Sequence, residues 1–143
     1  MTRGTSGASA ISETDARRVL DEAPFARWWG FALESIGDGI ATVRLPARDE
    51  FVRPGGSLQG AAPMALADAA FWIALMTKTG EERMALTLEM KTNFLRPARG
   101  DLRCEARVLR AGRRIVYGEA STFDTANTLV AHSTLTYIRP DTA

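Results

Sequence analysis

A run of sixteen residues, from 61 to 76, contains a single charged side chain, Asp68. The rest of the run is Ala, Leu, Met, Ile, Phe, Trp and Pro. A helix that is apolar on every side is buried in a fold rather than laid on its surface. The run is also shorter than the roughly 20 residues that a membrane span needs. We therefore expect a helix over residues 61–77 that the rest of the chain wraps.

Asp68 is out of place in such a helix. Removing a carboxylate from water costs several kcal/mol unless the group is paired or hydrogen-bonded. The run contains no Lys, Arg or His, and Asp68 lies at neither end of it. Two explanations stay open: a carboxylate that performs chemistry in a cleft, or a buried one bonded to a backbone amide or a partner subunit.

Composition narrows the class of protein. The 143 residues suffice for one domain with a proper core. With 18 basic and 17 acidic residues, the chain shows no charge excess that would favour nucleic acid or acidic membranes. The single cysteine, Cys104, excludes an internal disulfide and fits a reducing compartment. Residues 1–11, rich in Ser, Thr, Gly and Ala, predict a disordered tail rather than a signal peptide. We expect a cytoplasmic protein with one domain over 12–143.

Alternating apolar and polar residues predict the strands. They fall at 31–36 and 40–45 before the apolar run, and at 86–94, 102–108, 115–123 and 129–138 after it. A short helix over 12–23 begins at the N-cap Ser12 and ends before Pro24. One polar face per strand indicates an antiparallel sheet covered on one side. The fold class is therefore α+β, a curved antiparallel sheet around one long helix.

Residues 53–61 carry a motif. They read Arg-Pro-Gly-Gly-Ser-Leu-Gln-Gly-Ala, and Asp68 follows Gln59 by nine residues. With the strand order, this resembles the hotdog-fold acyl-CoA thioesterases, most closely the phenylacetate-pathway branch, over roughly residues 25–138. That branch has Asn-x-x-Gly-x-aliphatic-His-Gly-Gly and an Asp nine residues after the His. Similar downstream segments are 93–98 (Asn-Phe-Leu-Arg-Pro-Ala), 112–114 (Gly-Arg-Arg), 130–132 (Val-Ala-His) and 136–137 (Thr-Tyr).

The chain departs from that pattern at three places. Arg53 stands where the family has Asn, Gln59 where it has His, and Ala61 where it has the second Gly, whereas Gly56, Gly60 and Asp68 match. This Arg-Pro-Gly-Gly form of the loop indicates a variant branch. The resemblance implies a hotdog fold and thioester hydrolysis. With one histidine and one cysteine in the sequence, we propose no metal site, and we expect no cofactor. It also implies a homodimer or homotetramer with active sites at the subunit interface.

The matched residues suggest a division of roles. The N–H of Gly60 at the helix N-terminus, with Ala61 assisting, would stabilise a developing oxyanion; alternatively, Gly60 only fits a tight turn. Asp68 would be a general base or a nucleophile in the same cleft. Gln59 can orient a thioester or water but cannot transfer protons. The candidate substrate-binding residues are Arg53, Gly56, Ala61, Met64, Trp72, Asn93, Arg96, Arg113 and Arg114.

Several of these residues have a structural explanation as well. Arg96, Arg113 and Arg114 could bind CoA phosphates or form a solvated basic edge. Arg53 could pair with the substrate or a neighbouring chain, or be a solvated loop residue. Trp72 and Phe71 could line an acyl pocket or pack the core, and the aromatic segment 25–31 could be a lid or a pocket wall. Two other functions remain open: a hydratase, disfavoured because the only histidine, His132, lies in a strand, and a non-catalytic acyl-CoA-binding module.

Overall fold

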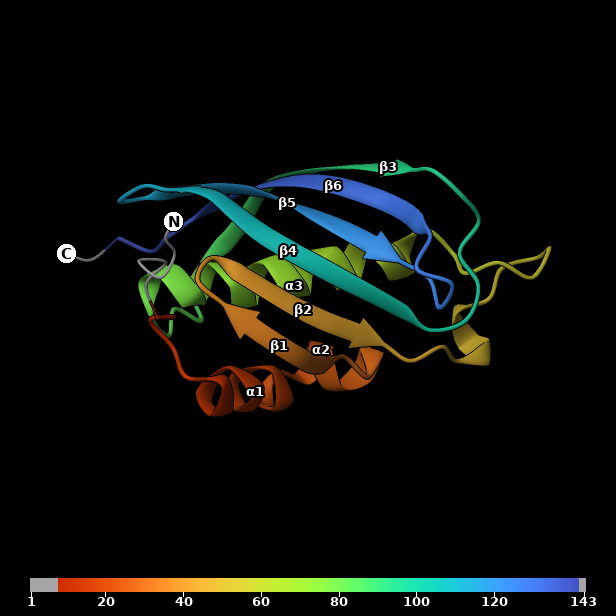
Figure 1. Cartoon of the computed structure of the whole chain (residues 1–143), viewed down its shortest axis with the longest axis horizontal. Helices are drawn as coiled ribbons and strands as arrows, with labels where there is room; N and C mark the ends of the chain where they lie inside the picture. The colour runs from red at the N-terminus through yellow and green to blue at the C-terminus, as the bar shows by residue number, and fades with distance from the viewer. Residues whose placement is uncertain (1–7, 142–143) are drawn as a thin grey trace.

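A computed structural model describes residues 8–141 of the chain. The first two helices, α1 (Glu13–Glu22) and α2 (Pro24–Trp29), precede a hairpin of strands β1 and β2 (Figure 1). The long helix α3 follows a loop, and four strands complete the chain. The bounds are β1 Ala32–Gly37, β2 Ile40–Leu45, a 3-10 turn Asp49–Phe51, α3 Ala61–Thr79, β3 Leu86–Phe94, β4 Leu102–Ala111, β5 Ile115–Phe123 and β6 Leu129–Ile138.

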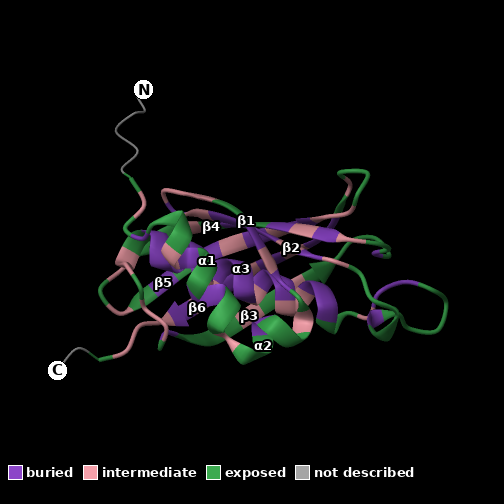
Figure 2. Ribbon diagram, turned by 90° about the horizontal axis from the view of Figure 1, so that it is seen from below, coloured by how far each residue is buried: buried purple, intermediate pink, exposed green. Residues whose placement is uncertain are grey.

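The six strands form one antiparallel sheet in the order β1-β2-β4-β5-β6-β3. The sheet curves over α3, which lies across its concave face (Figure 1). The core consists mainly of one face of the strands other than β3 and most of α3, as the buried colouring in Figure 2 shows. The apolar run therefore does form a wrapped helix, and the predicted curved-sheet architecture is confirmed.

Glycines mark both ends of α3. Gly60 is its N-cap residue with ordinary right-handed backbone angles, and Pro63 is accommodated in the first turn, where its missing N–H costs nothing. At the other end Gly80 adopts a φ of 85°, and its N–H donates to the carbonyl of Met76 at 2.9 Å. The hydroxyl of Thr77 accepts from Gly39 N–H at 2.8 Å, which ties the β1–β2 turn to the helix.

The N-terminal segment differs from the expected tail. Residues 1–7 lie outside the described part of the chain. Ile11, however, is buried in the core, and the Ala10 N–H donates to Thr77 O at 2.7 Å. An apolar side chain next to the end of α3 therefore orders residues that composition alone assigned to the tail. Ser12 caps α1 as predicted, by accepting from Asp15 N at 3.0 Å.

A helix not foreseen from the sequence follows directly. Pro24 does end α1, but it also begins α2 as its first residue, a position that suits its fixed φ. Within α2 and the residues after it, Trp28 and Trp29 meet edge to face at 5.0 Å, and Trp29 stacks on Phe31 at 6.0 Å between ring centroids. Trp28, Trp29 and Phe31 therefore pack against one another, whereas the ring of Phe25 lies 5.7 Å from that of Trp72, between centroids.

Strand β3 is an edge strand with an irregular register. It pairs only with β6, and a bulge lies between Thr87 and Glu89. The regular alternation predicted Leu86 and Leu88 on the same face as Met90. The bulge inserts an extra residue and reverses that pattern upstream. Leu86 and Leu88 are instead exposed, at 66% and 55%, and Thr87 turns towards α3.

Candidate active site

The carboxylate of Asp68 is held by two hydroxyl groups. Thr87, at the bulge of β3, donates from its Oγ1 to Asp68 Oδ1 over 2.8 Å. Tyr137, on β6, donates from its Oη to the same oxygen over 2.6 Å. Its Oη also lies 3.0 Å from the backbone carbonyl oxygen of Asp68. No described residue donates to Oδ2. The charge in the apolar helix is therefore stabilised through one oxygen, and the other is left for water or a ligand.

Asp68 lines a depression of about 220 Å³, which we call the carboxylate pocket. Its walls are mostly apolar. They include the rings of Phe25 and Trp72, whose centroids lie 5.7 Å apart and whose planes are tilted against each other. Its one cation, Arg83, is engaged by Glu81 at 2.8 Å and Glu22 at 2.9 Å. The lining residues are Phe25, Asp68, Ala69, Trp72, Arg83, Ala85, Leu86, Thr87 and Tyr137.

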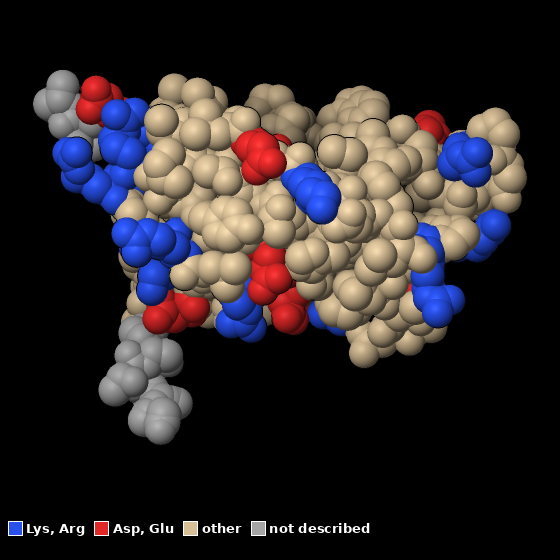
Figure 3. Space-filling view, turned by 90° about the horizontal axis from the view of Figure 1, so that it is seen from above, with Lys and Arg blue, Asp and Glu red and all other residues tan. Residues whose placement is uncertain are grey.

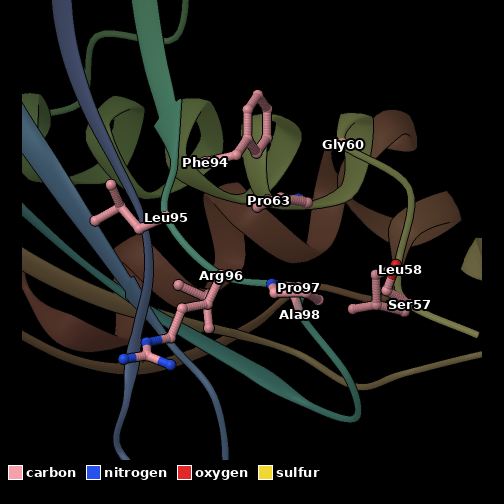
Figure 4. A pocket seen from close by; sticks show the side chains of 10 residues that line it. Ser57, Leu58, Gly60, Pro63, Phe94, Leu95, Arg96, Pro97 and Ala98 are labelled. Carbon is pink, nitrogen blue, oxygen red and sulfur yellow. The ribbon is translucent and has the colours of Figure 1, made fainter.

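Gly60 lines a different and larger depression of about 350 Å³, the loop pocket. The ring of Phe94 stands beside the first turn of α3, close to Gly60 (Figure 4). Within residues 8–141, neither the Gly60 N–H nor the Ala61 N–H donates a hydrogen bond. The lining residues are Ser57, Leu58, Gly60, Pro63, Phe94, Leu95, Arg96, Pro97, Ala98 and Val130.

The two pockets correct one sequence-based expectation. Asp68 was expected to face the same cleft as Gly60, with Ala61 and Met64 beside it. Eight residues of α-helix at 1.5 Å per residue separate Gly60 from Asp68 by about 12 Å. One thioester group cannot contact both at that distance. Within a single protomer the candidate oxyanion site and the candidate base are therefore apart.

The loop 53–59 is a tight turn that leads into α3. The Arg53 N–H donates to Ser57 O at 2.8 Å, and Gly55 and Gly56 adopt φ angles of 101° and 94°, which favour glycine. Gly56 also lies against Arg99, whose Nη1 would be 2.7 Å from an added Cβ. Among the described residues, those that line the two pockets include neither Arg53, Gly56 nor the half-buried Gln59.

The remaining predicted binding residues are scattered. Trp72 lines the carboxylate pocket and Arg96 the loop pocket, from which its guanidinium extends away from Gly60 (Figure 4). Asn93 pairs in register with His132, on the outer face of the sheet, so it faces away from α3. Arg113 and Arg114 lie in the β4–β5 connection, where Arg114 Nε donates to Arg139 O at 3.2 Å.

Sequence reasoning missed both partners of Asp68. Thr87 was read as part of the polar face of β3, because the bulge cannot be seen in the alternation. Tyr137 was noted only as part of a family-like segment. A tyrosine at an inward position of a strand does carry a signal, because a buried hydroxyl requires a hydrogen-bond partner. Phe94 was likewise noted only as a strand residue within the family-like segment 93–98.

A six-stranded antiparallel sheet around one long helix is the hotdog fold. Residues 55–131 match the family model described as the thioesterase superfamily. The chain is 32% identical over 87% of its length, and 93% of the relative's, to a protein of Thermoplasma volcanium named "Putative esterase".

Solved structures agree. A conserved protein of Pseudomonas aeruginosa is 36% identical with a TM-score of 0.80, over 87% of this chain and 99% of that one. The phenylacetic acid degradation protein PaaI of Thermus thermophilus, in a mutant form, is 26% identical with a TM-score of 0.74. The match covers 82% of this chain and 100% of that one. This chain belongs to the thioesterase superfamily. Membership and these relatives support a hydrolase that acts on thioesters. Among residues 8–141, no helix is long and apolar enough to cross a membrane.

Proposed function

We propose that this protein hydrolyses acyl-CoA thioesters to a free acid and CoA, with Asp68 as the catalytic carboxylate. The observation that carries the proposal is the geometry of Asp68 itself. Two hydroxyls hold its Oδ1, its Oδ2 accepts nothing from the described residues, and the surrounding pocket is largely apolar. A carboxylate with one free oxygen in such a pocket suits proton abstraction from water or attack on a carbonyl.

The reaction needs a second group to stabilise the carbonyl oxygen. The Gly60 and Ala61 N–H groups, both without acceptors in residues 8–141, are adjacent at the positive end of α3. In the base route, Asp68 Oδ2 takes a proton from water while the hydroxide adds to the carbonyl carbon; the C–S bond then breaks, and the thiolate is protonated. In the nucleophile route, Oδ2 attacks first, CoA leaves, and water hydrolyses the mixed anhydride.

Two copies of the chain bring these groups together. The loop pocket contains Phe94, at the C-terminal end of β3, and the carboxylate pocket contains Leu86 and Thr87, at its N-terminal end. The free edge of β3 can pair with the β3 of a second copy. If that pairing is antiparallel, the loop pocket of one protomer meets the carboxylate pocket of the other. Each of the two composite sites then takes Gly60 from one subunit and Asp68 from its partner.

The surface of β3 supports that homodimer. Leu86, Leu88 and Phe94 expose between 54% and 66% of their surface, and large apolar side chains on an edge strand favour association. Figure 3 shows this side of the molecule from above: uncharged groups cover most of it, a few acidic and basic groups lie near its middle, and further basic groups gather towards its ends. We also propose that two such dimers form a homotetramer. This step rests on the family resemblance alone.

The substrate's two ends have different surroundings. Trp72 and Phe25 offer flat apolar walls for the acyl group beside Asp68. An aryl acyl group fits these rings and also fits the phenylacetate-branch resemblance with its variant Arg-Pro-Gly-Gly loop. Arg96 would bind CoA phosphates from the rim of the loop pocket, with Arg113 and Arg114 as candidates at another edge. The buried, unpaired Cys104 fits a cytoplasmic location.

The first test is release of free thiol from short, medium, long and aryl acyl-CoAs. We expect turnover by the wild type and a loss of about a hundredfold or more in Asp68→Asn, the scale on which a general base contributes. If the wild type binds acyl-CoA but releases no thiol, the protein is the non-catalytic acyl-CoA-binding module instead. That alternative is open because Gln59, which stands where the family has His, cannot transfer protons.

A second test examines the composite site. Asp68→Asn and Gly60→Val are each expected to be inactive, and refolding them together yields mixed dimers with one intact site. Random pairing predicts recovery of about a quarter of wild-type activity. Refolding each variant alone is the control. Lack of recovery, with mixed dimers demonstrated by differently tagged subunits, would contradict the proposed arrangement.

A further inference from the structure

Tyr137 is a buried residue that joins the sheet to the catalytic helix. It lies on β6, opposite Thr87 on one side and Val116 on the other, and only 3% of its surface is exposed. Its ring packs on Phe71 of α3 with 5.3 Å between centroids. Its hydroxyl reaches both the backbone carbonyl and the carboxylate of Asp68. The side chain is therefore fixed by packing at one end and by hydrogen bonds at the other.

We infer that Tyr137 is a positioning residue that directs the reactive oxygen of Asp68. It donates to Oδ1 at 2.6 Å, and Thr87 donates to that same oxygen at 2.8 Å. Two donors on one oxygen fix the rotation of the carboxylate, and Oδ2 is the atom left to meet water or the thioester. This inference deepens the proposed function and rests on it.

The hydroxyls are the groups available for this task. Arg83, the cation of the carboxylate pocket, is engaged by Glu22 and Glu81. A hydrogen bond to an ionised acceptor is stronger than one between neutral groups. Burial, together with the neighbouring Asp68 carboxylate, raises the pKa of Tyr137 well above its ordinary value. The phenol therefore keeps its proton and remains a donor throughout the pH range in which the enzyme would work.

A purely structural role predicts different behaviour. The carbonyl of Asp68, at 3.0 Å, would by itself satisfy a buried tyrosine hydroxyl. In that case the loss of the hydroxyl would lower stability but would not act through the carboxylate. A positioning role predicts instead that the loss slows catalysis only while Asp68 is present. The two roles can be separated by combining substitutions.

The experiment is a double-mutant cycle on thiol release. Tyr137→Phe keeps the ring and removes the hydroxyl, and we expect kcat to fall about tenfold or more with KM nearly unchanged. In an Asp68→Asn background the same change should have no further effect on kcat. Tyr117→Phe, the same chemical change at an exposed residue of the outer face, is the matched control and should retain full activity. Thermal unfolding of each variant reports any loss of stability separately.

A second readout does not depend on activity. Tyr117 and Tyr137 are the two tyrosines of the chain, so carbon-13 labelling of the phenol carbon gives two resonances, and Tyr117→Phe assigns them. The Tyr137 resonance should move on Asp68→Asn, because its acceptor loses its charge.

The outcomes separate the two proposals. Wild-type turnover that Tyr137→Phe leaves unchanged, or that it lowers equally with and without Asp68, overturns the positioning role alone. If the Tyr137 resonance shifts but the wild type shows no turnover, the hydrogen bond between Tyr137 and Asp68 exists but the proposed hydrolysis is wrong. Tyr137 then has no positioning role in catalysis. An unchanged resonance overturns the hydrogen bond itself.

Discussion

The ring of Phe94 lies so close to Gly60 that a Cβ on Gly60 would be 3.3 Å from its Cζ atom. That distance is tight, but Phe94 is half exposed and can yield, and the backbone of Gly60 is in the right-handed region. We expect Gly60→Ala to fold with a stability change below about 1 kcal/mol. The methyl group should crowd the thioester and lower kcat/KM by up to about a hundredfold. Denaturant titration and thiol release measure the two effects.

Phe94→Leu provides the corresponding control. The smaller side chain should leave room for the methyl group, so the double variant Gly60→Ala, Phe94→Leu should recover part of the activity lost by Gly60→Ala. Full activity of Gly60→Ala alone would exclude the loop pocket as the place where the thioester carbonyl binds.

Leu88 should contribute to association through the β3 edge. A lysine in place of this exposed leucine puts a charge on the proposed dimer interface, where desolvation would oppose assembly. We expect Leu88→Lys to be monomeric by analytical ultracentrifugation and inactive, because each proposed composite site needs two subunits. Leu109→Lys, on β4, is matched in exposure at 54% against 55% and should remain dimeric and active. A monomeric variant with full turnover would contradict the composite site.

Thr87 should affect turnover more than stability. Its hydroxyl donates to Asp68 from an exposed position on the edge strand. Thr87→Val keeps the shape and removes the donor, so we predict a kcat lower by about tenfold with a change in unfolding free energy below about 1 kcal/mol. Thr134→Val, on the outer face of β6, serves as the control and should leave kcat intact. Equal effects of both substitutions would argue against a specific role for Thr87.

Gly118 is required by the contact between the sheet and α3. A Cβ at this position would lie 2.2 Å from Arg107 O and 2.4 Å from a ring carbon of Phe71. Neither backbone nor a core ring can move away at small cost, so Gly118→Ala should destabilise the fold by about 3 kcal/mol or prevent folding. In Gly37→Ala the nearest atom outside its chain neighbours is 3.9 Å away, so that variant should unfold near the wild-type midpoint. Similar denaturation midpoints would show that the sheet adapts at Gly118.

Cys104 should make the protein less stable in alkali. Burial raises the pKa of its thiol from 9.0 to about 12. Between those values the unfolded chain releases the proton and the folded chain keeps it, so the free energy of unfolding falls as pH rises. The slope is at most about 1.4 kcal/mol per pH unit for one group. Denaturant titrations from pH 8 to 11 should show a shallower fall for Cys104→Ala than for the wild type, after normalising to about pH 8. Parallel curves would contradict this assignment.

The order of the elements followed from local patterns in the sequence. The apolar run could only be a wrapped helix, and the period-2 segments could only be strands with one covered face. The cap at Ser12 is also local, since it depends on a few neighbouring backbone groups. α2 was not predicted because its six residues are too few to show a helical period.

Two features of the candidate site depended on distant parts of the chain. The bulge at Thr87 reverses which side chains of β3 face the helix, and no residue in the strand marks it. Tyr137 and Asp68 are 69 residues apart in sequence and meet only because β6 crosses α3 in the folded sheet.

The sequence by itself determined that one carboxylate would stand in an apolar helix, because nothing nearby in the chain could neutralise Asp68. It also identified the glycine at the start of that helix. Only the tertiary structure decided what holds the carboxylate, because hydrogen bonds between distant elements depend on sheet register. It also showed that Gly60 and Asp68 open into separate pockets, because helical rise keeps them about 12 Å apart.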